Sequence, residues 1–85
     1  MTQKTFQPGT LVTVMTTSDF VELYSSHSDD GVLRYQYATH RTFLYNEIAI
    51  VVTTSLTGAP SVRPKAYIMC PAGIGWVYSD VLVKV

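Results

Sequence analysis

The fold is decided by the C-terminal stretch Gly73-Ile74-Gly75-Trp76-Val77-Tyr78-Ser79-Asp80-Val81-Leu82-Val83-Lys84-Val85. It reads as two apolar segments joined by a short polar corner. An apolar strand at the end of a chain needs neighbouring strands to pair with it and cover it. We therefore predict a strand, a tight turn and a final strand that close a small sheet.

The composition of the rest of the chain is also that of a β protein. Val and Thr each occur eleven times, whereas the helix former Glu occurs twice. β-Branched residues favour strands over helices. With 85 residues there is room for one domain. We predict a single all-β domain over residues 1–85, a small barrel of five to six antiparallel strands.

Turn residues divide the chain into further strands. Ser25 to Gly31 is the clearest loop, and the two prolines between residues 55 and 64 exclude regular pairing there. Pro71-Ala72-Gly73 turns the chain into the closing stretch. The expected strands before this turn cover residues 10–17, 20–25, 32–37, 48–54 and 65–70, with 20–25 a short strand or an extended loop arm.

Alternation within these strands predicts their faces. Leu33, Tyr35 and Tyr37 should share one face of an amphipathic strand, which residues 39–42 interrupt. Residues 48–54 look the most buried, with Ile48, Ile50 and Val52 on one face and Ala49 on the other. In the segment 65–70 the alternation places Ala66, Ile68 and Cys70 in one row and Tyr67 and Met69 in the other.

The closing residues also carry a resemblance to a known architecture. Gly75-Trp76-Val77-Tyr78-Ser79-Asp80-Val81-Leu82 resembles the closing signature of Src-homology-3-like (SH3-like) barrels, and Gly9-Thr10-Leu11-Val12 resembles their opening strand. The resemblance implies a strongly bent barrel with a 3₁₀ turn before the last strand. The layout is also similar to that of short barrel proteins encoded by tailed phages, which are often of unknown function or act in virions and their assembly.

The chain departs from the peptide-binding members of that superfamily at the groove. Tyr78 stands where those members have a proline, and Val81 where they have a tyrosine. Trp76 is the only tryptophan, so the paired tryptophans of the groove are missing. Leu23-Tyr24 resembles another groove motif, but Ser25-Ser26 follows it. The resemblance therefore implies the fold without its proline-rich ligand.

Charge and hydropathy indicate the class of partner. Six basic residues balance six acidic ones, 14% of residues are charged and 47% are hydrophobic. A neutral chain creates no long-range field for phosphate backbones, and an apolar surface favours burial against another subunit. We expect a homo-oligomer or another protein partner. The alternative is weak binding of single-stranded nucleic acid by stacked aromatics and the basic residues Arg34, Arg41, Arg63 and Lys65.

The aromatic residues are the strongest functional signal. Tyr combines apolar area with a polar tip, which suits interfaces. The candidate interaction face consists of Tyr35, Tyr37, Tyr67, Trp76 and Tyr78. The alternative is that most of these rings pack the core and the barrel ends, Trp76 above all.

The remaining polar residues do not predict chemistry. His27, Asp29 and Asp30 share a loop that reads as a solvated turn, Cys70 as a packed thiol, and Asp80 as the cap of the tight turn. We expect no catalytic or cofactor-binding residues, because a domain this small offers little concave volume in which to shift pKa values. We expect no metal site, because a third convergent ligand and the spacing of a calcium loop are absent.

These observations predict a non-catalytic module that acts by protein contact or self-association. One cysteine cannot form an intramolecular disulfide, which favours a reducing cytoplasmic setting. The resemblance to phage-encoded barrels implies a place in a virion as the alternative. The first residues lack the apolar core of a signal peptide, and no apolar run approaches membrane-spanning length. We expect no membrane partner.

Overall fold

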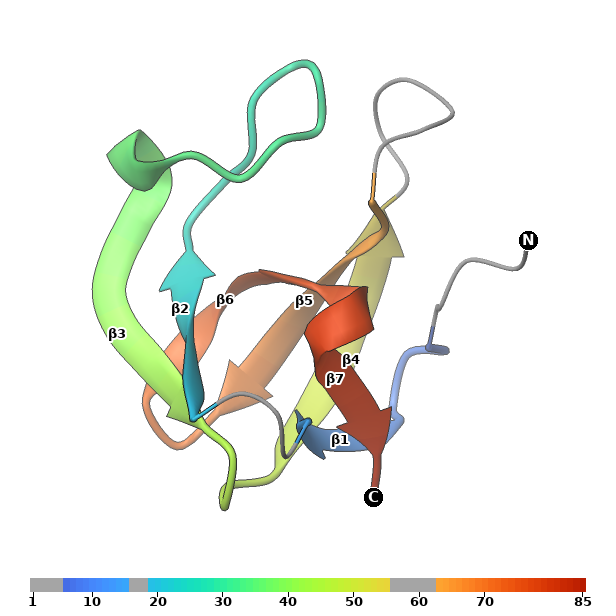
Figure 1. The fold of residues 1–85 in the computed structure, drawn as a ribbon. Helices are drawn as coiled ribbons and strands as arrows, with labels where there is room; N and C mark the ends of the chain where they lie inside the picture. The colour runs from blue at the N-terminus through green and yellow to red at the C-terminus, as the bar shows by residue number, and fades with distance from the viewer. Residues whose placement is uncertain (1–5, 16–18, 56–62) are drawn as a thin grey trace.

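The chain folds into one antiparallel sheet that curls on itself (Figure 1). The structure is a computed structural model that describes residues 6–15, 19–55 and 63–85. In this part of the chain the sheet has seven strands in the order β3-β2-β6-β5-β4-β1-β7. The all-β class is confirmed, and the strands are more numerous than the five to six expected.

The strands are short and two 3₁₀ turns connect them. Their bounds are β1 Leu11–Val14, β2 Phe20–Tyr24, β3 Ala38–Leu44, β4 Ala49–Ser55, β5 Lys65–Cys70, β6 Gly73–Tyr78 and β7 Leu82–Lys84. The 3₁₀ turn η1 (Tyr35–Tyr37) precedes β3, and η2 (Ser79–Val81) precedes β7.

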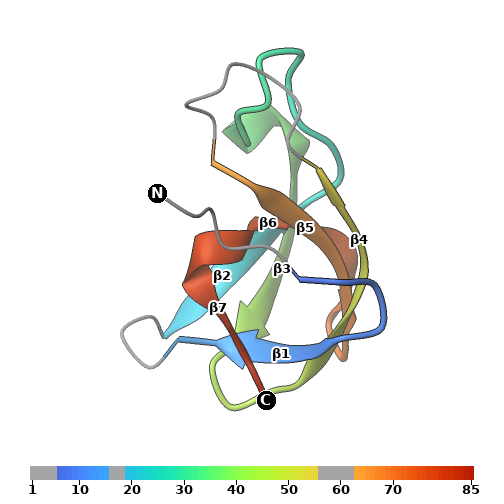
Figure 2. The same cartoon turned by 90° about the vertical axis from the view of Figure 1, so that its right-hand side faces the viewer.

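The curl of the sheet encloses the core. Figure 2 shows β4 and β5 along one side of the molecule, with β2 and β7 on the other. Every strand contributes a buried apolar residue to the interior; the largest are Phe43, Leu23, Ile68, Leu82, Val12, Val14, Val51 and Val77. The sheet is thus a half-barrel whose edges are β3 and β7.

The closing stretch has the predicted form of strand, 3₁₀ turn and strand. β7 pairs with β1, so that Val14 lies opposite Leu82 and both side chains are buried. The Val85 amide donates to the Leu11 carbonyl at 3.0 Å, and the Met15 amide donates to the Val81 carbonyl at 2.9 Å. These bonds hold the described C-terminus against β1.

Gly75 permits the tightest crossing in the sheet. β2 meets β6 where Tyr24 lies opposite Trp76. A Cβ atom on Gly75 would lie 2.7 Å from Cβ of Leu23 and 3.2 Å from the backbone nitrogen of Tyr24. Only glycine allows the two backbones to approach so closely, because any side chain would displace β2.

The predicted strand at 32–37 is wrong. The Val32 amide donates to the Asp30 carboxylate at 3.1 Å, and the Leu33 amide donates to the Tyr78 hydroxyl at 3.0 Å. The Tyr37 amide then donates to the Arg34 carbonyl at 2.9 Å, which closes η1. Local groups and a distant side chain therefore bind the amides that a strand would have offered to its neighbour.

The predicted interruption at 39–42 is also wrong, because β3 runs through it. The strand pairs with β2 from Ala38 to Leu44. Its register shifts between Glu22 and Tyr24, and His40 has a φ of 62°. Histidine is among the residues that tolerate this left-handed conformation. The irregularity in the sequence appears as a bulge inside the strand.

The predicted strand at 48–54 is present as β4, but it is less buried than expected, and β5 is the more buried strand. Ala49 and Val51 are buried, whereas Ile48 is 53% exposed and Val52 is 42% exposed. The small Ala49 and Val51 face the inside of the curl, where space is limited. The larger apolar side chains stand on the outside.

Candidate binding site

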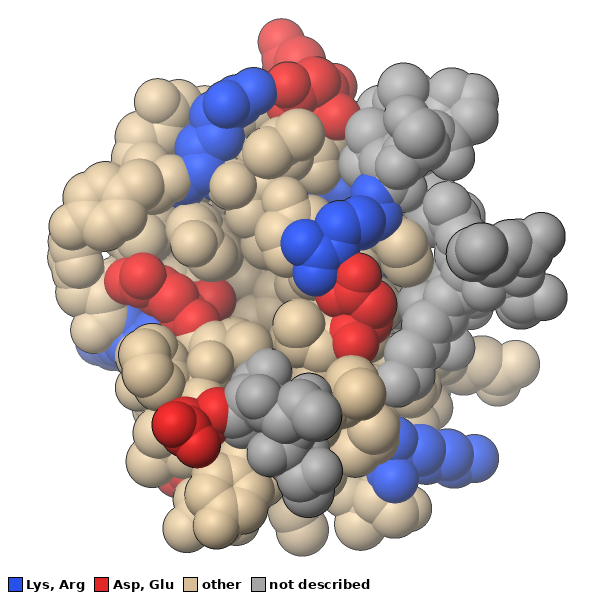
Figure 3. All heavy atoms as spheres, viewed as in Figure 1, with Lys and Arg blue, Asp and Glu red and all other residues tan. Residues whose placement is uncertain are grey.

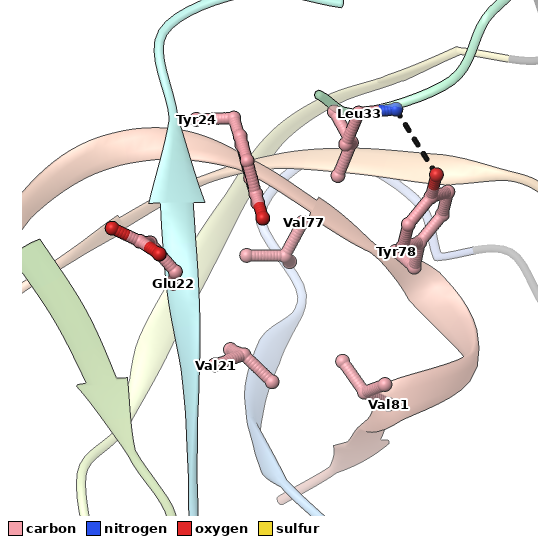
Figure 4. A pocket seen from close by; sticks show the side chains of 7 residues that line it. All are labelled: Val21, Glu22, Tyr24, Leu33, Val77, Tyr78 and Val81. Carbon is pink, nitrogen blue, oxygen red and sulfur yellow. Dashed lines mark hydrogen bonds between the residues drawn. The ribbon is translucent and has the colours of Figure 1, made fainter. Parts of the chain in front are cut away.

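A pocket of about 190 Å³ opens where β2, β6 and η2 meet the segment before η1 (Figure 4). The buried Val77 forms part of its wall. The residues that line it are Val21, Glu22, Tyr24, Leu33, Val77, Tyr78 and Val81.

The walls of the pocket are mainly aliphatic. Figure 4 shows Val21, Val77 and Val81 around its lower part. The Tyr24 ring reaches in from β2 with its hydroxyl toward the space, whereas the Glu22 carboxylate points away. The arrangement offers apolar contact on several sides and one phenolic group near the centre.

The Tyr24 hydroxyl is suited to donate a hydrogen bond. Among the described residues it has no hydrogen-bond partner. Burial raises its pKa above the ordinary value of 10.0, and the nearby Glu22 and Tyr78 raise it further. The phenol therefore stays protonated at neutral pH and can donate to a carbonyl oxygen placed in the pocket.

Tyr78 is fixed by contacts at its tip and on its ring. Its hydroxyl accepts the Leu33 amide, which joins the segment before η1 to the end of β6. The Arg63 guanidinium lies over the ring, 3.8 Å from its centroid, and its Nε donates to the Asp80 carboxylate at 2.7 Å. This wall of the pocket is preformed, because each of these three side chains is held by a partner.

Asp80 does not cap the tight turn as expected. Tyr78 occupies the N-cap position of η2 and makes no capping hydrogen bond with its side chain. The Asp80 carboxylate binds Arg63 through both oxygens. The charged Arg63 guanidinium makes stronger hydrogen bonds to this carboxylate than the neutral amides of the turn would make.

The predicted aromatic face separates into three places. Tyr67 and Trp76 pack together on the outside of the sheet with ring centroids 4.9 Å apart, and His27 meets Trp76 edge-on at 5.1 Å. Tyr78 lines the pocket, while Tyr35 and Tyr37 lie in η1. Trp76 is only partly buried and lies outside the core, so the alternative that it packs in the core is wrong.

The predicted basic contacts are engaged within the chain. Arg34 pairs with Asp30 at 2.6 Å, and Arg63 pairs with Asp80. Lys65 is fully buried, with its ammonium donating to the Arg63 carbonyl at 3.2 Å, and Arg41 donates to the Ala72 carbonyl at 3.4 Å. Figure 3 shows charged side chains scattered among uncharged ones on the face that it displays.

The remaining candidates are the Cys70 thiol, metal ligands and a membrane-spanning helix. Cys70 is a free, buried thiol, as expected. In residues 6–15, 19–55 and 63–85, no three His, Cys, Asp or Glu side chains come together in a way that could hold a metal ion. Within the same ranges, no helix is long and apolar enough to cross a membrane.

Sequence reasoning did not predict this pocket, although it named three of the residues that line it. The resemblance drew attention to Tyr24, Tyr78 and Val81 as groove positions, and all three line the pocket. It missed Val21, Glu22, Leu33 and Val77, because their convergence depends on the crossing of β2 over β6. The Leu-Tyr pair followed by a short loop was the available signal for β2.

Comparison with protein-family models, with curated proteins and with solved structures gives no match for the chain.

Proposed function

We propose that this protein is a non-catalytic, SH3-like binding module that takes an apolar side chain of a partner polypeptide into the pocket between β2, β6 and η2. The observation that supports this most is the size and lining of the pocket. Sites for drug-sized ligands span about 300–1,000 Å³, whereas this one has about 190 Å³ with mostly aliphatic walls. That space suits one side chain better than a free metabolite.

The Tyr24 hydroxyl gives the site a reason to prefer a polypeptide. An apolar residue held by Val21, Val77 and Val81 brings its own backbone carbonyl close to the pocket. A protonated phenol beside it donates to that carbonyl and fixes the orientation of the bound segment. Apolar contact supplies affinity, and the hydrogen bond supplies direction.

We expect the pocket to bind an aliphatic residue and not a proline-rich segment. Proline-rich ligands dock in grooves with aromatic walls. By the resemblance, Val81 and Tyr78 correspond to the tyrosine and the proline of the peptide-binding members of the SH3-like superfamily. Trp76 lies outside the pocket. The resemblance to phage-encoded barrels favours a protein of an assembly as the partner. The two would meet in the cytoplasm or in a virion.

Binding of single-stranded nucleic acid is the second proposal and has less support. Arg34 and Arg63 are already paired with carboxylates, and Lys65 is buried. Titration of labelled single strands at low salt tests it: binding that weakens as salt rises supports it, and no binding removes it.

Selection from a displayed library of short peptides tests the pocket proposal. We expect the recovered peptides to share an aliphatic residue. They should bind Tyr24→Phe more weakly and lose binding to Val81→Asp, because the first variant removes a donor and the second places a charge in an apolar wall. The control Met69→Glu alters an exposed residue outside the pocket and should bind normally. Peptides that bind all three variants equally well would contradict the proposal.

A further inference from the structure

The pocket between β2, β6 and η2 has a single formal charge in its lining. Of the seven residues that line it, Glu22 alone carries one. Its carboxylate points away from the aliphatic walls, on the β2 side of the pocket (Figure 4). Glu22 and Tyr24 are two positions apart on β2, so their side chains leave the strand on the same face, about 7 Å apart. The carboxylate and the phenol are therefore neighbouring polar groups at one margin of the pocket.

The Glu22 carboxylate lacks a strong partner within the part of the chain that the structure describes. It makes no hydrogen bond there, and its one basic neighbour within ion-pair distance is His40, whose Nδ1 lies 3.8 Å from Oε1. That separation is longer than a hydrogen bond, and an imidazole balances a carboxylate only when its ring is protonated. The Glu22 side chain is 28% exposed, against 71% for His40. A carboxylate that is mostly shielded from water and poorly paired gains from a cation that a ligand supplies.

On the Tyr78 side of the pocket, the charges of the described residues cancel. The Arg63 guanidinium lies over the Tyr78 ring and binds both carboxylate oxygens of Asp80. The chain as a whole has a net charge of +0, so it creates no long-range field that draws in basic or acidic ligands. A preference of this site for a cation would therefore come from Glu22 itself.

We propose that Glu22 makes this site specific for a polypeptide segment with a lysine or arginine within two residues of its aliphatic residue. The inference rests on the binding of such a segment in the pocket, as proposed above, and adds a second element to its recognition. An extended segment advances about 3.3 Å per residue, so two residues cover the separation of about 7 Å between Tyr24 and Glu22. The aliphatic residue then fills the pocket, the Tyr24 hydroxyl donates to a backbone carbonyl, and the basic side chain binds Glu22.

Parallel selections from the displayed peptide library against the wild type, Glu22→Gln and Glu47→Gln test the role of Glu22. Glu47→Gln is the matched control, because it removes the same charge outside the pocket, and its amide oxygen can still accept the Leu44 amide that Glu47 binds. The wild type and Glu47→Gln should both enrich Lys or Arg within two residues of the aliphatic residue. Glu22→Gln should recover the aliphatic residue without that enrichment. Circular dichroism and thermal unfolding confirm that each variant is folded.

A double-mutant cycle measures the contact between Glu22 and the basic residue. A peptide recovered on the wild type is synthesised with an acetylated amino terminus, which removes the terminal ammonium as a second cation, and again with glutamine in place of its basic residue. In fluorescence anisotropy titrations, either Glu22→Gln or the exchange in the peptide should weaken binding about three- to tenfold, between the values for an exposed ion pair and for a hydrogen bond to a charged group. With Glu22→Gln in place, the exchange in the peptide should have little further effect.

The outcomes separate this inference from the proposed function. Wild-type peptides that share an aliphatic residue without a nearby Lys or Arg would overturn the inference and leave the pocket proposal standing. The same holds if the exchange in the peptide weakens binding equally to the wild type and to Glu22→Gln, because the basic residue would then bind elsewhere. Peptides that share no aliphatic residue would contradict the pocket proposal and this inference with it.

Discussion

The two faces of β5 differ in what they hold together. Ala66 and Ile68 point into the curl and are fully buried, whereas Met69, the next residue, is 54% exposed. Both faces are apolar, so composition alone does not distinguish them. The difference teaches that the curl of the sheet decides which apolar residues stabilise the monomer. The residues left outside are available for contacts with another molecule.

The largest expected effect is the difference in unfolding free energy between substitutions at two adjacent residues of β5, one on each face. Ile68→Ala should lower the free energy of unfolding by about 2–5 kcal/mol, because it leaves a cavity in the core. Met69→Ala should lower it by less than about 1 kcal/mol, since its side chain is mainly solvated in the monomer. Urea unfolding followed by Trp76 fluorescence at low micromolar concentration measures both. Equal losses would show that the faces are not distinct.

A smaller effect is expected at the crossing of β2 and β6. Gly75→Ala places a methyl group against Leu23 and Tyr24, and should lower the free energy of unfolding by about 1–3 kcal/mol. Thr53→Ala, on the exposed outside of β4, serves as a control that should change it by about 0.5 kcal/mol or less. The same urea titrations apply. An unchanged Gly75→Ala variant would mean that the two strands do not approach closely.

The smallest effect concerns Lys65, a charged residue among buried ones. Burial lowers its pKa below the ordinary value of 10.5, against a weaker opposing attraction from Asp30. Between the folded pKa and 10.5 the unfolded chain binds more protons than the folded chain, so this group makes stability rise with pH in that window. Below this pH window, the Lys65 ammonium is charged in both states, and its burial lowers the free energy of unfolding by its full desolvation cost.

Replacement of Lys65 by an apolar isostere should remove this penalty. Lys65→Met is expected to be more stable than the wild type by about 1 kcal/mol at about pH 7, even though the bond to the Arg63 carbonyl is lost. The advantage should shrink toward pH 10.5, where the wild-type amine loses its proton. Urea unfolding of both proteins from about pH 7 to about pH 10 measures this, and curves that stay parallel would contradict it.

The sequence predicted the parts of the fold that depend on local patterns. Alternation correctly grouped Ala66, Ile68 and Cys70 in one row, which is the inward one in the structure, and Pro71-Ala72-Gly73 placed the turn between β5 and β6. The closing turn and β7 followed from Ser79-Asp80 and the apolar residues after it. Period-two patterns and turn residues suffice where strands adjacent in sequence also pair in space.

The parts that failed depend on distant contacts. The alternation from Leu33 to Tyr37 is that of a strand, but the Leu33 amide binds Tyr78, 45 residues away. The inward position of Val51 depends on the direction of curl, which single-strand alternation does not contain. The pocket itself was not predicted, although the resemblance named Tyr24, Tyr78 and Val81 as groove positions at which this chain departs from the peptide-binding members. Val21 and Leu33 reach it only through tertiary structure.

Amide NMR of the ¹⁵N-labelled chain tests most directly the claim that β2, β6 and η2 form the binding site. Addition of a peptide recovered by the library selection should shift amides of β2 and η2 that adjoin the pocket. The amides of Met69 and Ile74, which are exposed and lie outside the pocket, should keep their positions. Peptide shifts centred on Met69 and Ile74 would contradict the account.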